Sequence, residues 1–267
     1  MGRTLAVANQ KGGVAKTTTV ASLGAALAEL GQRVLLVDLD PQACLTFSLG
    51  FDPEDLEESL VTALHGGDPT AAVLDCEERL SLLPTTIELA GLEAELAGRP
   101  DREYVVATLL ARLQAEAKAY DAEAKPYDWV LLDCPPTLGV LTVAALTAAD
   151  SVLIPLQCEA LAHRGVGQLL DTVYDVREFT NPRLRVLGVL PTMYDGRTTH
   201  ARRVLENIAQ TYQLEVLQPS IPKTIRFAEA PAFGATILST HPRSRGAQAY
   251  RAVAAALLAD SDATRPR

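Results

Sequence analysis

Residues 8–20 read "ANQKGGVAKTTTV" and hold most of a phosphate-binding loop. The general pattern is G-x-x-x-x-G-K-[ST]; Gly12, Gly13, Lys16 and Thr17 are in place, whereas Ala15 stands where the last glycine belongs. In such a loop, successive backbone N–H groups and the start of a helix converge on phosphate oxygens, which the lysine neutralises. We therefore expect a nucleotide site at this loop.

Strand and helix signals alternate on both sides of the loop. The predicted strands are apolar on both faces, which is typical of a parallel sheet covered by helices on both sides. The sequence thus predicts an α/β fold of the P-loop NTPase type, with a mostly parallel central sheet. The predicted strands span residues 4–9, 33–38, 129–133, 151–156 and 184–191, and the predicted helices include 16–30 and 164–178.

The length of 267 residues allows one large α/β domain or two small ones, and we expect a single domain over residues 1–260. Between about 52 and 125, Ala, Leu and Glu recur at helical spacing. This pattern predicts a helical, acidic elaboration of the same domain with solvated acidic faces. The last residues, 261–267, are predicted to be a disordered tail.

Composition excludes several classes of protein. Hydrophobic residues make up 48% of the chain, but no apolar run approaches the roughly 18 residues that a membrane-spanning helix needs. The N-terminal residues lead straight into a strand without a secretory signal, so a cytoplasmic location is expected. The four cysteines lie far apart without a C-x-x-C pair, which argues against a metal or iron–sulfur cluster.

The net charge of the whole chain, −9, argues against a nucleic-acid partner, but this charge is unevenly distributed along the sequence. Residues 181–251 contain ten Lys and Arg against four Asp and Glu, a local charge of +6 that leaves −15 for the rest. The last third of the chain is therefore a candidate for contact with a polyanion.

Three aspartates stand at the ends of predicted strands. Asp38 and Asp40 follow "VLLV", and Asp133 ends "WVLLD". Ligands of an open parallel sheet bind outside the carboxyl ends of its strands, so these carboxylates should arrive beside the loop. Asp133 is predicted to hold magnesium together with Thr17, and Asp40 to orient the attacking water. The alternative, strongest for Asp38, is that these residues only cap turns.

The motifs "KGGVAKTT", "DLDPQ", "DCPP", "PTMYDGRT" and "AEAPAFG" together resemble the ParA/Soj family of deviant Walker-A ATPases over nearly the whole chain. The resemblance implies magnesium-dependent ATP hydrolysis in a homodimer that sandwiches ATP. It also implies that Lys11 reaches the phosphates of the partner subunit, where a cation stabilises the charge on the transferring phosphoryl group. Hydrolysis in this family is slow and is stimulated by a ParB-like partner.

The same resemblance implies further nucleotide contacts. Met193 and the segment 221–234 are expected around the adenine, with Pro222 as the contact, and Glu159 near the partner's nucleotide. The segment around Glu159 departs from the family's usual Tyr-Tyr-Ala-Leu-Glu-Gly, since His163 and Arg164 lie in it. The residues expected to contact the phosphates are Gly12, Gly13, Val14, Ala15, Lys16, Thr17 and Thr18.

The basic last third fits the same resemblance, because ParA/Soj dimers bind double-stranded DNA without sequence preference. Arg197 and Arg226 match the positions that carry this binding. The alternative is a solvated basic face. Such phosphate contacts are nonspecific and weaken steeply with salt. A nucleoid-associated location and a role in chromosome or plasmid partitioning follow as expectations. The plausible neighbours are Lys223, Arg243 and Arg245, with Arg202 and Arg203 nearby.

Other functions of similar proteins are disfavoured. A MinD-like membrane protein ends in a basic amphipathic helix, whereas the last 19 residues here have a narrow Ala/Leu face without Phe, Trp or Lys. A reductase resembling the nitrogenase iron protein needs paired cysteines at a dimer interface, and none of the four lies in such a motif. A positioning ATPase for another cargo remains an alternative.

Ala15 leaves a non-enzymatic alternative open: a degenerate P-loop protein that serves as a DNA-binding or scaffold module. If the backbone at Ala15 requires a positive φ, the alanine is strained by roughly 1 kcal/mol or more and its methyl group could crowd the phosphates. If the residue is right-handed, alanine costs little. A working ATPase is favoured by the otherwise intact set of Lys11, Lys16, Thr17, Asp40 and Asp133.

Overall fold

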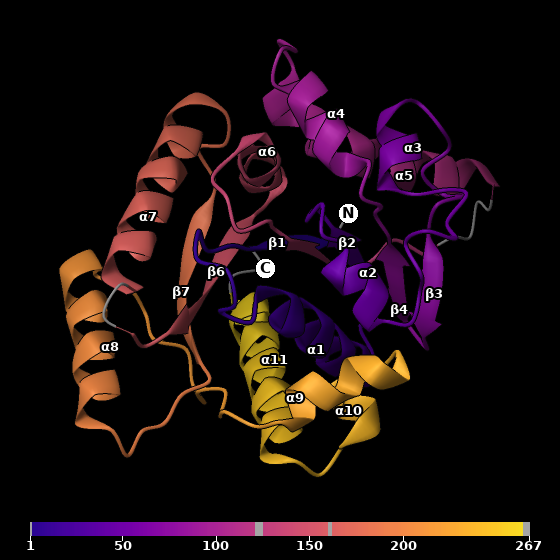
Figure 1. Ribbon diagram of the computed structural model, residues 1–267. Coiled ribbons are helices and arrows are strands. Elements are labelled where there is room, and N and C mark those ends of the chain that lie inside the picture. The colour runs from indigo at the N-terminus through magenta and orange to yellow at the C-terminus, as the bar shows by residue number, and fades with distance from the viewer. Residues whose placement is uncertain (1, 121–124, 160–161, 264–267) are drawn as a thin grey trace.

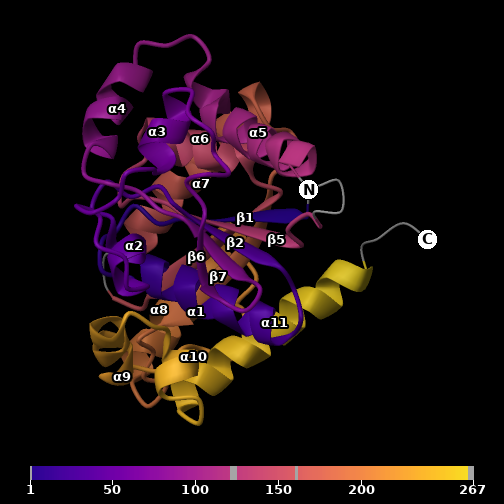
Figure 2. The ribbon, with the colours of Figure 1, turned by 90° about the vertical axis from the view of Figure 1, so that its right-hand side faces the viewer.

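The computed structural model describes residues 2–120, 125–159 and 162–263 (Figures 1 and 2). Within them the chain forms a seven-stranded sheet in the order β3-β4-β2-β5-β1-β6-β7. Each neighbouring pair is parallel except β3 and β4, which are antiparallel. The predicted α/β fold with a mostly parallel sheet is confirmed. The strands are β1 Arg3–Val7, β2 Val34–Asp38, β3 Leu74–Glu77, β4 Leu80–Leu83, β5 Trp129–Asp133, β6 Ser151–Gln157 and β7 Arg185–Thr192.

Helices cover both faces of this sheet, as Figure 2 shows. On one face the core joins α5, α6, α7 and α8 to the strands, and on the other it joins α1, α10 and α11. The larger helices are α1 Lys16–Glu29, α4 Leu89–Leu96, α5 Val105–Tyr120, α6 Val140–Ala148, α7 Ala162–Phe179, α8 Thr199–Tyr212 and α11 Arg245–Ala263. The short ones are α2 Cys44–Ser48, α3 Leu60–Leu64, α9 Arg226–Glu229 and α10 Ile237–Thr240, with 3-10 turns η1 Arg102–Tyr104 and η2 Ala230–Phe233.

The central strands are buried on both faces, which explains their continuous apolar sequences. Every residue of β2 and β5 is buried, and the two strands pair in parallel so that Asp38 lies opposite Asp133. On the other side of β5, Val7 of β1 also lies opposite Asp133. This register brings both aspartates and the start of the phosphate-binding loop to one edge of the sheet, as expected for parallel strands.

The segment from 52 to 125 is not wholly helical. Besides α3, α4 and α5 it contains β3 and β4, which extend the sheet beyond β2. The strand β4 has only four residues, and acidic residues precede it. A short apolar run beside acidic residues also fits one turn of an amphipathic helix, so the sequence alone does not identify it as a strand. Its pairing with β2, more than 40 residues away, decides its conformation.

The C-terminal region differs in detail from the expected tail. Helix α11 extends to Ala263, so the first three residues of that segment are helical, and residues 264–267 lie outside the described residues. Among the helices described, none is long and apolar enough to cross a membrane.

Candidate nucleotide site

The phosphate-binding loop is fastened at both ends by residues from distant strands. Asn9 donates from Nδ2 to the carbonyl of Pro155 in β6 at 2.8 Å, and its Oδ1 accepts the backbone N–H of Lys11 at 3.0 Å. The hydroxyl of Thr192, at the end of β7, donates to the carbonyl of Val14 at 2.9 Å. These contacts hold the loop in place from both ends. The side chain of Val14 is buried and does not line the cavity beside the loop.

Lys16 begins α1 and is almost fully buried, with 6% of its surface exposed. Its Nζ donates to the carbonyl of Lys11 at 3.3 Å, across the mouth of the loop. Burial lowers the pKa of the Lys16 ammonium, while the carboxylates of Asp133 and Asp40 oppose that shift. A buried cation held between a loop carbonyl and two acids is poised for anionic oxygens.

Ala15 adopts the left-handed conformation, with φ 66° and ψ 36°. The sequence left open whether Ala15 has a positive φ or a right-handed conformation. The structure has the positive φ, which is strained for alanine. Gly13 is also left-handed, with φ 72°, but as a glycine it pays no steric penalty. The hydrogen bonds of Asn9 and Thr192 hold the loop in this geometry, which overrides the preference of alanine for a negative φ.

Replacing Ala15 with glycine is expected to stabilise the ligand-free protein by about 0.5–1 kcal/mol. The strain of roughly 1–2 kcal/mol that the methyl group causes is relieved, and it exceeds the roughly 0.4–1 kcal/mol of extra chain entropy that glycine loses on folding. Chemical denaturation measures the difference.

The matched control for this prediction is Ala255→Gly, at an exposed position within the right-handed helix α11. That change should destabilise the protein by about 1 kcal/mol. A destabilisation by Ala15→Gly of similar size would show that the alanine is not strained.

Asp38 is completely buried and holds its neighbourhood together. Its carboxylate accepts the backbone N–H of Asp40 at 3.2 Å, and the N–H and hydroxyl of Thr46 at 2.9 and 2.8 Å. The hydroxyl of Thr46 in turn accepts the N–H of Thr85 at 3.1 Å. Burial raises the pKa of Asp38 to about 6, against these hydrogen bonds. The Asp38–Thr46–Thr85 connection joins β2, α2 and the end of β4, and sequence spacing gave no sign of it.

Asp133 is buried as deeply but lacks such partners. Neither oxygen of its carboxylate accepts a hydrogen bond within the described part of the chain. Burial raises the pKa of Asp133 well above its ordinary value, and the nearby Asp38 acts in the same direction. The Thr17 hydroxyl, which lies near the carboxylate but outside hydrogen-bond geometry, and the Lys16 ammonium oppose the rise. An unpartnered buried carboxylate is costly, so its presence calls for an explanation.

A metal ion held together with phosphate oxygens would provide that explanation. The Thr17 hydroxyl and the carboxylate of Asp133 are hard oxygen donors, which suit magnesium. Within the ranges that the structure describes, no cluster of three or more His, Cys, Asp or Glu side chains could hold a metal by itself. The two residues therefore fit a magnesium ion whose remaining ligands come from phosphates and water.

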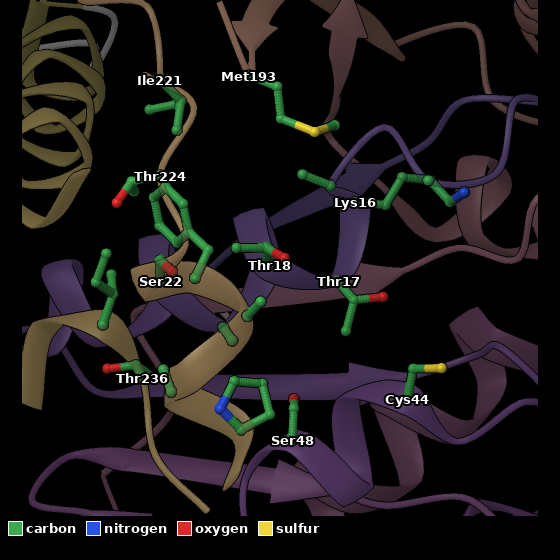
Figure 3. Close-up of a pocket in the computed structure, with 18 of the residues that line it drawn as sticks. Lys16, Thr17, Thr18, Ser22, Cys44, Ser48, Met193, Ile221, Thr224 and Thr236 are labelled. Carbon is green, nitrogen blue, oxygen red and sulfur yellow. The ribbon is translucent and has the colours of Figure 1, made fainter. Parts of the chain in front are cut away.

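A cavity of about 920 Å³ opens beside the loop (Figure 3). Its size is at the upper end for a small-molecule site. Asp40, which is 9% exposed, lies on its wall, and its Oδ1 accepts the N–H of Gln42 at 3.0 Å. Of the residues predicted from the sequence, the lining includes Gly12, Gly13, Ala15, Lys16, Thr17, Thr18, Asp40, Met193, Pro222 and Lys223.

Part of the cavity lining was not anticipated residue by residue. Ser22 lies one turn beyond Thr18 on α1, and Figure 3 shows both side chains along the cavity. Helical spacing from Thr18 could have indicated Ser22. Three aromatic residues of this lining come from α2, α9 and α11: Phe47, Phe227 and Tyr250. Phe227 lies in the segment 221–234 expected around the adenine, whereas no sequence signal indicated Phe47 and Tyr250.

Lys11 and Glu159 lie outside this lining and form an ion pair with each other. Both side chains are partly exposed, at 36% and 51%. The segment that follows Glu159 includes residues 160 and 161, which lie outside the described residues. Beyond it, the ring nitrogen Nδ1 of His163 lies 2.9 Å from the hydroxyl of Tyr212, which ties α7 to α8.

The residues predicted to bind DNA differ in their environments. Arg197 and Arg226 each form an ion pair with a carboxylate of the same chain, Asp195 and Glu229 respectively. Lys223 lies on the cavity wall. The others are exposed: Arg243 and Arg245 at the turn into α11, and Arg202 and Arg203 on α8.

The parallel sheet, the loop entering α1 and the acids at the strand ends define a P-loop nucleotide-binding protein. Residues 2–186 match a family model described as an AAA domain. The chain is 43% identical over 252 residues to the sporulation initiation inhibitor protein Soj of Bacillus subtilis, covering 94% of this chain and 96% of Soj. It is 42% identical to the chromosome partitioning protein ParA of Caulobacter vibrioides, covering 93% and 91%. The chain belongs to the ParA/Soj family of chromosome-partitioning ATPases.

Among solved structures, a cobyrinic acid a,c-diamide synthase from Mycobacterium smegmatis with a bound ATP analog and magnesium is 53% identical. It has a TM-score of 0.85, and the match covers 99% of this chain and 98% of that one. The names of these three relatives thus differ: one refers to inhibition of sporulation, one to chromosome partitioning and one to diamide synthesis.

Proposed function

We propose that this protein is a magnesium-dependent ATPase of chromosome or plasmid partitioning, which pairs face to face around ATP and binds DNA nonspecifically as that dimer. The observation that carries the proposal is the unpartnered buried carboxylate of Asp133 beside Lys16 and Thr17, next to a cavity large enough for a nucleotide. The ATP analog and magnesium bound by the Mycobacterium smegmatis relative support the same ligands for this chain.

The roles proposed for the residues rest on their positions around the loop and on the resemblance to the family. Lys16 and the N–H groups of residues 12–18 bind the phosphates, while Thr17 and Asp133 hold the metal. When bound, magnesium neutralises charge on the phosphate oxygens. Asp40 orients the attacking water. Met193 and Pro222 contact the adenine, and Glu159 faces the nucleotide of the partner subunit.

Lys11 acts on the phosphates of the partner subunit in this proposal. In the single protomer its ammonium is paired with Glu159, so dimerisation has to exchange that carboxylate for phosphate. The pair is partly exposed and therefore weak enough to break readily. Hydrolysis is slow in the absence of a ParB-like partner, and the DNA-bound dimer places the protein in the cytoplasm on the nucleoid.

Binding of double-stranded DNA with ATP, with ADP and without nucleotide, each at low and moderate salt with magnesium, tests the proposal. Binding only with ATP supports it. Binding that is indifferent to nucleotide would favour a degenerate scaffold, and ATP hydrolysis without DNA binding would favour a positioning ATPase for another cargo.

Asp40→Ala is expected to trap an ATP-bound dimer that still binds DNA. Removing the carboxylate leaves the phosphate-binding loop intact but removes the group that orients water, which should lower the hydrolysis rate by about 100-fold or more. Light scattering with ATP and a phosphate-release assay measure the two effects. Asp55→Ala, at an exposed position, is the control. Hydrolysis by Asp40→Ala at the wild-type rate would contradict the role of Asp40.

A further inference from the structure

The two arginines that the family resemblance predicts to bind DNA each form an ion pair with a carboxylate of the same chain. The guanidinium of Arg197 pairs with Asp195 through two bonds, Nε to Oδ1 at 2.9 Å and Nη2 to Oδ2 at 2.8 Å. The backbone N–H of Arg197 also donates to Oδ1 at 3.1 Å. Arg226 donates from Nη1 to Oε2 of Glu229 at 2.7 Å, one turn along α9.

The remaining basic residues of the predicted surface behave differently. Lys223, Arg243 and Arg245 are exposed, and none forms an ion pair with an acid in the part of the chain that the structure describes. Of the five residues predicted to bind DNA, only Arg197 and Arg226 therefore form ion pairs within the described part of the chain.

We propose that Asp195 and Glu229 compete with DNA phosphates for Arg197 and Arg226, so that DNA binds only by displacing a carboxylate from each arginine; this rests on the proposed DNA-binding function. The two-pronged contact with Asp195 uses the same guanidinium fork that a phosphate would use. One guanidinium edge cannot hold both partners. The carboxylates also repel a phosphate that approaches the free edge.

The pairs are of a strength that allows this exchange. Arg197 is 90% exposed and Arg226 48%, and exposed ion pairs contribute little because water and salt screen them. The pKa of Asp195 is lowered to about 2 by its hydrogen bonds with Arg197, so this acid stays charged at neutral pH. His241 Nε2 lies 3.9 Å from the carboxylate of Glu229 and is its other basic neighbour.

Competition keeps the affinity of a single protomer for polyanions low. An ATP dimer presents both pairs twice and gains twice the number of phosphate contacts once the carboxylates are displaced.

The test compares Asp195→Asn, Glu229→Gln and the double variant with wild type, in the full-length protein with ATP and magnesium. Each single variant should bind double-stranded DNA about two- to fivefold more tightly at moderate salt, a range set by the weakness of exposed pairs. Since wild type and variants contact the same number of phosphates once DNA is bound, the dependence of log affinity on log salt should stay nearly the same.

Matched controls remove the same charge far from the arginines. Asp175→Asn and Glu178→Gln lie in the last turns of α7, at the opposite end of the sheet from the end of β7, as Figure 1 shows. They correct for the change in net charge. Thermal melting confirms that each variant is folded, and the two sites give independent readings.

Three outcomes overturn the inference. Weaker DNA binding by the carboxylate variants would mean that Asp195 and Glu229 orient the arginines toward DNA rather than compete with it. Affinities equal to those of the two α7 controls would mean that no competition exists. If neither wild type nor any variant binds DNA with ATP, the proposed function itself fails. If wild type binds DNA and the variants bind it equally well, only the competition fails.

Discussion

Lys16→Ala is expected to lower the affinity for ATP by at least about 100-fold. Lys16 is the buried cation of the loop, and its ammonium reaches across the loop mouth to the carbonyl of Lys11, where phosphate oxygens would take over. Each charge-assisted bond of this kind contributes about 1.5–3 kcal/mol, and alanine removes all of those that the ammonium makes. Titration calorimetry with ATP and magnesium measures the loss.

Lys11→Ala is the matched control in the same loop. Its ammonium pairs with Glu159 and lies outside the cavity lining, so its loss should change the ATP affinity of a protomer by less than about threefold. The same variant should fail to form the ATP dimer. Equal losses of ATP affinity from both variants would show that the two lysines share one site, contrary to the roles proposed for them.

Asp133→Asn is expected to act in opposite directions on catalysis and on stability. Without nucleotide, the wild-type carboxylate is buried without a hydrogen-bond partner in the part of the chain that the structure describes. Replacing a charge by a neutral amide should therefore stabilise the ligand-free protein by about 1–3 kcal/mol near pH 8. The same change removes the proposed metal ligand and should lower the magnesium-dependent ATPase rate by about 100-fold or more.

The stabilisation by Asp133→Asn should depend on pH in a defined direction. The pKa of Asp133 is raised in the folded state, so the folded protein binds this proton more tightly than the unfolded chain does. Stability is then full below the ordinary pKa of 3.8 and falls as the pH rises toward the folded value. Asp38 adds a loss of the same sign between about pH 4 and its raised pKa of about 6.

Melting temperatures of wild type and variant, measured from pH 4 to pH 8 without nucleotide, check this prediction. The two curves should converge near pH 4 and separate as the pH rises, with the Asp133→Asn variant the more stable of the two. Asp175→Asn, at an exposed site on α7, should follow wild type throughout. A variant less stable than wild type at pH 8 would mean that the carboxylate has a stabilising partner in solution.

Much of the site was predictable because it depends on local sequence. The loop residues Gly12 to Thr17, the apolar strands and the acids that end them are each encoded within a few positions. The parallel arrangement follows from the alternation of strands and helices, and it brings Asp38 and Asp133 opposite each other without further information. The resemblance to the ParA/Soj family could be recognised from the same short motifs.

Pairings between distant residues were not predictable in this way. Asp38 could be interpreted from sequence as a turn cap, and only its hydrogen bonds to Thr46 reveal that it connects three elements of the structure. The strands β3 and β4 are short, and polar residues flank them, so the sequence alone does not identify them as strands. Their conformation depends on pairing, of β4 with β2 and of β3 with β4. The pairing of Arg197 and Arg226 with carboxylates likewise depends on side-chain placement.

Sequence by itself determined the fold class, the strand-to-helix position of the loop and the set of residues that meet at one sheet edge, because these follow from hydrophobic periodicity and fixed spacing. Tertiary structure alone decided the conformation of Ala15, since the anchors Asn9 and Thr192 bind the loop to β6 and β7, more than 140 residues away. Those long-range hydrogen bonds hold the backbone at a positive φ that alanine by itself would avoid.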